Sequence, residues 1–97
     1  MKQVTELKRG YITLIRDERI NVWHISIYIA FLYLWVRKKG INPLYITRKK
    51  VMKLAHISSI ATYHKCIKQL QEFGYIRYVP SYNRFLGTQV FLVAVPD

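Results

Sequence analysis

The stretch SSIATYHKCIKQLQEFGYIRYVP, residues 58–80, changes its hydrophobic period at Gly74. Apolar residues before the glycine recur at helical spacing, whereas those after it alternate with polar residues as in a β-strand. The helical ridge consists of Tyr63, Cys66, Ile67, Leu70 and Phe73. Serine is a good N-cap and glycine a common helix stop. We therefore predict a helix from Ser59, or Ser58, to about Phe73, followed by a strand over 75–79 that Pro80 ends.

A second predicted helix lies just before this stretch. Thr47 is a suitable N-cap for a helix over Arg48–Ala55, in which the apolar residues recur at helical spacing and the cations face outward. Residues 56–58 then form the turn. Residues 47–73 are therefore predicted to be a helix-turn-helix.

The C-terminal part of the chain is predicted to be a β-hairpin. Residues 81–87 are rich in turn formers, and they separate the first strand from a returning strand over 88–95. The hairpin thus spans residues 75–95. The order helix, helix, turn, helix, hairpin predicts a single α+β domain over residues 1–97 with three helices.

The N-terminal half is predicted to contain one long helix. Asn21 can cap a helix over residues 21–39, which Gly40 stops. Residues 1–20 are predicted to be an N-terminal arm. The β-branched run over residues 11–15 is either a short strand or extended chain within this arm.

The long helix is unusually apolar. Residues 20–36 carry no formal charge, but a length of 17 residues is at the short limit for crossing a membrane, so a buried core helix is favoured. Apolar side chains occur nearly all round this helix, and one small core cannot bury every side. We therefore predict a homodimer through this helix, with the contact made by Trp23, Ile27, Phe31 and Trp35.

The charge of the chain is strongly one-sided. Sixteen Lys and Arg against five Asp and Glu give a formal net charge of +11. Residues 37–84 contain eleven of the basic residues and a single acid, Glu72, which amounts to +10 from half of the chain. A surplus of this size attracts polyanions, although scattered lysines can also serve only to keep a protein in solution. The distribution predicts that an anionic partner docks on the C-terminal half.

Residues 58–80 resemble the recognition helix and first wing strand of the winged helix-turn-helix family. The resemblance covers residues 44–95, and it is carried by the ending Leu-x-x-x-Gly-Tyr-Ile, which Leu70, Gly74, Tyr75 and Ile76 form here. It implies that the helix over 59–73 enters the major groove of DNA and that the hairpin tip touches the flanking backbone. Residues 15–20 are similar to the entry of the winged-helix domains of plasmid and phage replication proteins, in which a short strand and a loop precede the first helix.

Three groups of residues are candidates for contact with DNA. On the predicted recognition helix, the face opposite the apolar ridge contains Ser59, Ile60, Thr62, His64, Lys65 and Lys68. Short hydroxyls and an imidazole can reach base edges, and an isoleucine can contact a thymine methyl group. Backbone phosphates are assigned to the preceding helix, through Arg48, Lys49, Lys50 and Lys53, and wing contacts to Tyr82, Asn83 and Arg84. Because the recognition face has no arginine, we expect much of the affinity to be electrostatic.

The leading hypothesis is sequence-preferring binding of double-stranded DNA, as a transcriptional regulator or a mobile-element accessory protein. One alternative is a replication-initiation or primosome module that acts mainly as an assembly part. Another is a protein-interaction winged helix with no role in nucleic-acid binding. A single cysteine and three scattered histidines predict neither a disulfide nor a metal site, and we expect no cofactor, no small-molecule ligand and no enzymatic activity. The lone cysteine and the lack of a secretory signal are typical of a cytoplasmic protein.

Overall fold

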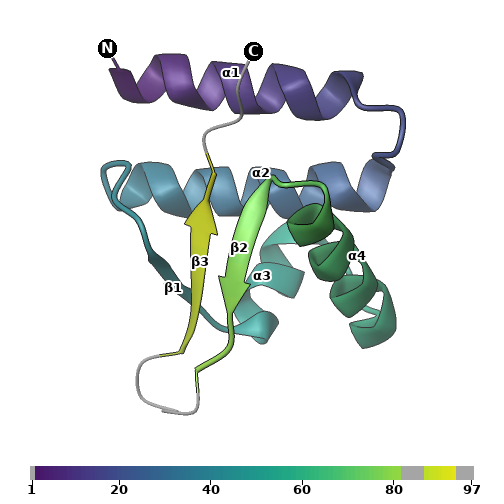
Figure 1. Ribbon diagram of the computed structural model, residues 1–97. Coiled ribbons are helices and arrows are strands. Elements are labelled where there is room, and N and C mark those ends of the chain that lie inside the picture. Colours follow the sequence, from purple (N-terminus) through teal and green to yellow (C-terminus); the bar gives the residue numbers. More distant parts are fainter. Residues whose placement is uncertain (1, 82–86, 94–97) are drawn as a thin grey trace.

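The computed structural model describes residues 2–81 and 87–93, with side chains from residue 8 onward. These residues form an α+β structure with four helices and a three-stranded antiparallel sheet (Figure 1). The elements are α1 (Lys2–Arg16), α2 (Val22–Arg37), β1 (Leu44–Ile46), α3 (Arg48–Ala55), α4 (Ile60–Glu72), β2 (Ile76–Val79) and β3 (Thr88–Leu92). The sheet order is β1-β3-β2, an arrangement compatible with a winged helix.

The prediction for the N-terminus is wrong, because residues 2–16 form a helix and not a strand or an extended arm. Figure 1 shows α1 lying along α2, on the side away from α3 and α4. Leu14 is fully buried, and Gly10 lies so close to the hydroxyl of Tyr28 that a β-carbon at this position would collide with it. The hydroxyl of Thr13 donates to the carbonyl of Arg9 at 2.9 Å, as β-branched hydroxyl residues do within helices. Burial of the Leu14 face therefore overrides the strand preference of this segment.

The helix predicted over residues 21–39 is confirmed, with its end two residues earlier. Asn21 is the N-cap, its side chain accepts from the backbone N–H groups of Trp23 and His24, and α2 ends at Arg37. Gly40 has a positive φ of 73°, and its N–H closes the end by donating to the carbonyl of Trp35 at 2.9 Å. Among the described residues, no helix is both long enough and apolar enough to cross a membrane.

The structure corrects the residues expected to form a dimer contact. Ile27 and Phe31 are fully buried and Trp35 is 6% exposed, because α1, α3 and α4 all pack against α2 within one chain. A second copy is not needed to cover these three side chains. Of the four residues proposed for the contact, Trp23 alone is substantially exposed.

The two predicted N-caps, at Thr47 and Ser59, are confirmed. The side chain of Thr47 accepts from the N–H of Lys50 at 3.2 Å, and that of Ser59 accepts from the N–H of Thr62 at 3.1 Å. His56 closes α3 in the left-handed conformation, with a φ of 57°. The apolar ridge of α4 faces the core as predicted.

The sheet contains a strand that the sequence did not reveal. Residues 44–46 form β1, with Leu44 paired to Val90 of β3. The side-chain amide of Asn42 extends this pairing, because it donates to the carbonyl of Leu92 and accepts from the N–H of the same residue. Residues 88–92 pair on their other side with β2, as expected for a hairpin. Three residues of alternating burial are too short to give a strand signal without their partner strand.

A polar cluster ties the α1–α2 loop to the junction of α4 and β2. Asp17 accepts from the guanidinium of Arg19 at 2.6 and 2.9 Å and from the hydroxyl of Tyr75 at 2.8 Å. The same guanidinium lies 4.1 Å from the ring centroid of Phe73. The hydrogen bonds from Arg19 hold the pKa of the Asp17 carboxyl well below its usual range, and burial with the Asp17 contact raises the pKa of Tyr75 to about 12.

Replacing Asp17 by asparagine is expected to destabilise the chain at pH 7 and to make its stability less dependent on acid pH. A carboxyl whose pKa is lowered by folding stabilises fully above the unfolded value of about 4, and this contribution is lost as the pH falls toward the folded value. Urea midpoints of the parent chain and D17N should therefore differ at pH 7 and approach each other between about pH 4 and pH 2. Glu18→Gln removes the same charge from the exposed neighbour and is the control. A difference that stays constant to pH 2 contradicts the assignment.

Candidate nucleic-acid interface

The outer face of α4 is polar, basic and exposed. Its buried side consists of Tyr63, Cys66, Ile67 and Leu70. Of the six residues predicted to contact DNA from the recognition helix, five are exposed and Thr62 is half-buried. Ile60 is 50% exposed and therefore accessible for an apolar contact. The exposed five are Ser59, Ile60, His64, Lys65 and Lys68.

Two exposed residues near the start of α4, Ser59 and His64, also make contacts within the chain. The Ser59 hydroxyl oxygen is engaged by the N–H of Thr62, so this side chain caps the helix whatever else it contacts. The ring of His64 packs edge-on against that of Tyr63, with centroids 5.4 Å apart. This contact limits the orientations of the exposed imidazole.

Polar contacts to α2 and β2 fix the orientation of α4. His24 is 1% exposed, and its Nδ1 accepts from the backbone N–H of Asn21 at 2.9 Å. The proton of the neutral ring is therefore on Nε2, which donates to the side-chain oxygen of Gln69 at 2.7 Å. On the other side, the side-chain oxygen of Gln71 accepts from the N–H of Tyr78 at 2.7 Å. Helix α4 is thus held from two directions while its outer face remains uncovered.

The bridge from His24 was not predicted from the sequence. The signal available is a histidine three residues after the N-cap Asn21, the position at which a capping box normally has Glu or Gln. That spacing is compatible with the contact to Asn21. The hydrogen bond to Gln69 could not be predicted from that spacing, because Gln69 is 45 residues away in the chain.

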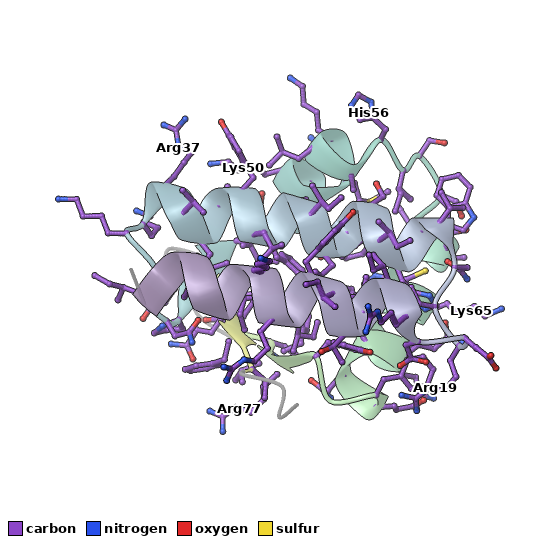
Figure 2. The ribbon with its side chains drawn as sticks, turned by 90° about the horizontal axis from the view of Figure 1, so that it is seen from above. Arg19, Arg37, Lys50, His56, Lys65 and Arg77 are labelled. Carbon is purple, nitrogen blue, oxygen red and sulfur yellow. The ribbon has the colours of Figure 1, made fainter. Side chains whose placement is uncertain are left out.

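Lys50 of α3 and Lys65 of α4 point in different directions (Figure 2). All four predicted phosphate contacts on α3, Arg48, Lys49, Lys50 and Lys53, are exposed. Figure 2 shows Lys50 along one edge of the molecule together with Arg37 and His56, whereas Lys65 projects from another side. Lys50 and Lys65 therefore do not lie on one flat patch. A helix inserted in a groove about 12 Å wide meets phosphates on both walls, and cations pointing in different directions suit such a position.

The predicted wing contacts Tyr82, Asn83 and Arg84 lie outside the described residues. Within the described part of the hairpin, Arg77 on β2 is exposed, and its guanidinium lies 4.5 Å from the ring centroid of Phe91. Figure 2 places Arg77 on the edge opposite Lys50. Sequence analysis did not single out this arginine.

Burial makes the Cys66 thiol and the Tyr63 hydroxyl harder to ionise. Burial raises the pKa of the Cys66 thiol and disfavours the nucleophilic thiolate. Burial also raises the pKa of Tyr63, whose hydroxyl lies 3.4 Å from that of Tyr78. Within the described part of the chain, no three His, Cys, Asp or Glu side chains lie together in a way that could hold a metal ion.

No protein-family model, curated protein or solved structure matches the chain.

Proposed function

We propose that this chain is a winged helix-turn-helix protein that binds double-stranded DNA, with α4 in the major groove. The observation that carries the proposal is the continuous exposed face of α4, polar and basic from Ser59 to Lys68, with a buried apolar ridge behind it. The strand order β1-β3-β2, with a hairpin directly after this helix, supports the winged-helix assignment. The proposed role is that of a transcriptional regulator or mobile-element accessory protein.

In the proposed complex, side-chain chemistry assigns phosphate contacts to α3 and base contacts to α4. Lysine and arginine on α3 bind phosphates, because a helix N-terminus adds its dipole to their charge. Imidazole, hydroxyl and methyl groups at the start of α4 contact base edges. Arginine and asparagine, which read bases in the bidentate mode, are absent from the exposed α4 face, so electrostatic attraction supplies most of the affinity.

The proposal is tested by a salt titration of duplex binding. If about six phosphates are neutralised, the logarithm of the binding constant should fall with the logarithm of salt concentration at a slope of about −5. Fluorescence anisotropy with a labelled random-sequence duplex between 50 and 200 mM salt, roughly the range in which such proteins lose most affinity, measures this slope. Selection from a random duplex pool then identifies the preferred site. Absence of binding at the low-salt end, or a flat titration, contradicts DNA binding and favours the protein-interaction alternative.

A homodimer remains part of the proposal, but through a different row of α2 residues. Val22, Ile29, Tyr33 and Val36 are 66%, 46%, 48% and 55% exposed. Their spacing follows a heptad pattern, and the segment over residues 20–36 has no formal charge, so the repulsion between two basic chains is weakest along it. In an antiparallel two-fold pairing centred on Ile29, Val22 of each copy lies opposite Val36 of the other.

Light scattering at high micromolar concentration is expected to report a dimer. Ile29→Glu should convert it to a monomer, because two carboxylates would meet near the two-fold axis. Ile15→Glu is the matched control, since Ile15 on α1 is also 46% exposed and should leave the dimer intact. A monomeric parent chain contradicts this arrangement. It would favour the replication-module alternative, in which the same α2 row contacts a different protein.

A further inference from the structure

A hollow of about 220 Å³ opens where the end of α2, strand β1 and the start of α3 meet. This space is far larger than the roughly 10–15 Å³ that one water molecule needs. Three of its six lining residues are cations, contributed by two helices that are adjacent only in the folded chain. The lining residues are Leu34, Arg37, Lys38, Leu44, Tyr45 and Lys50.

The polar groups of the hollow are hydrogen-bond donors. The guanidinium of Arg37 is positioned by a hydrogen bond of 3.1 Å to the hydroxyl of Tyr33 and retains further N–H groups for a ligand. The hydroxyl of Tyr45 accepts from the side-chain amide of Gln89 at 3.2 Å, which leaves the phenolic proton available for donation. Lys38 and Lys50 have no carboxylate partner among the described residues.

The electrostatics of the hollow favour an anion through its side chains. The C-terminal end of α2 opposes an anion and the N-terminal end of α3 favours one, so the two helix dipoles largely cancel. Three cations that line one hollow repel one another, and an anion bound there reduces that repulsion. Leu34 and Leu44, the two apolar lining residues, are 9% and 2% exposed, whereas Arg37, Lys38 and Lys50 are exposed to solvent.

We propose that this hollow binds a phosphate group, through Arg37, Lys38, Lys50 and the hydroxyl of Tyr45. Arginine matches the tetrahedral oxygens with paired N–H groups, while the lysines supply point charges. The phosphate has two sources with the same chemistry: the backbone of bound DNA or a free phosphate-bearing ligand. The DNA source rests on the proposed duplex binding, whereas the phosphate site itself does not.

The experiment has two arms that use the full chain and its Lys50→Gln variant. In the first, amide chemical shifts are followed while inorganic phosphate is added at constant ionic strength, with chloride as the reference ion. Saturable shifts confined to the surroundings of Arg37, Lys38, Tyr45 and Lys50, and lost in K50Q, are expected. In the second, duplex affinity is measured against salt for the parent chain, K50Q and Lys8→Gln, which removes one charge from the exposed surface of α1, on the side away from α3 and α4.

The two arms separate the possible results. Localised phosphate shifts together with a salt slope that is about one unit smaller in K50Q than in K8Q assign the hollow to a DNA phosphate. Localised shifts with equal slopes in the two variants assign it to a free phosphate-bearing ligand. Shifts that are no larger than those caused by chloride, or that persist in K50Q, overturn the site. If the parent chain fails to bind duplex at all, the proposed function fails while the phosphate arm still decides the site.

Discussion

Replacing Leu14 by alanine is expected to lower the free energy of unfolding by about 2–5 kcal/mol. Leu14 is fully buried and is the residue that joins the main hydrophobic core among the α1 side chains that the structure describes. Its truncation removes apolar burial and leaves a cavity between α1 and α2. For a domain of this size a loss of 1 kcal/mol lowers the Tm by about 4–8 °C, so the shift is large on the scale of typical total stability.

The neighbouring Ile15 provides the matched control for this measurement. It is 46% exposed, and Ile15→Ala should change the stability by about 0.5 kcal/mol or less. Urea unfolding followed by circular dichroism gives both values. Equal, small effects of L14A and I15A would mean that α1 does not pack on the core, and that residues 1–20 are the arm expected from the sequence.

Replacing His64 by alanine is expected to weaken binding to the preferred duplex by about 1–3 kcal/mol, or about 5- to 150-fold, with little effect on random duplex. The imidazole is exposed on the outer face of α4 and takes no part in its cap. Ser59 needs a different substitution, because alanine would also remove the N-cap and cost about 0.5–2 kcal/mol of stability. Ser59→Gly removes the hydroxyl and costs the cap only a few tenths, roughly, so it tests base contact more cleanly. Thr62→Ala, at a half-buried position, completes the set of base-contact variants.

A phosphate-contact variant on α3 is the comparison for these substitutions. Lys49→Ala should weaken the preferred and scrambled duplexes by similar factors and reduce the salt slope by about one unit, with Arg48→Ala expected to behave alike. The ratio of affinities for the two duplexes therefore separates base contact from phosphate contact. If the His64, Ser59 and Thr62 variants weaken both duplexes equally, α4 does not read bases and the proposed docking is wrong.

The difference between α1 and α4 shows how far sequence patterns reach. In α4 the ridge from Tyr63 to Leu70, the cap at Ser59 and the stop at Gly74 all indicate the same helix, so the sequence predicts it well. In α1 the β-branched residues favour a strand, and Gly10 interrupts the helical pattern. Helix formation there depends on packing against Tyr28, a contact that no local pattern contains.

In the candidate interface, the sequence likewise predicts some features, whereas others depend on tertiary packing. The exposure of His64, Lys65 and Lys68 follows from helical periodicity once the buried ridge is known, and sequence reasoning placed them correctly on the outer face. The directions in which Lys50 and Lys65 point, and the meeting of Arg37 with Lys50 at one hollow, depend on the packing of α2 against α3 and β1. Contacts between segments that are distant in the sequence cannot be predicted from local sequence patterns.

The sequence by itself determined the helix-turn-helix, the hairpin and the concentration of positive charge in residues 37–84, because caps, glycine stops, hydrophobic period and charge are local properties. Only the tertiary structure decided that residues 2–16 form a helix, that residues 44–46 complete the sheet, and that Ile27 and Phe31 are core residues. It also decided that His24 joins α2 to α4. Each of these depends on which surfaces meet when the chain closes on itself, and the free energy of burial and hydrogen bonding there outweighs the weak local preferences.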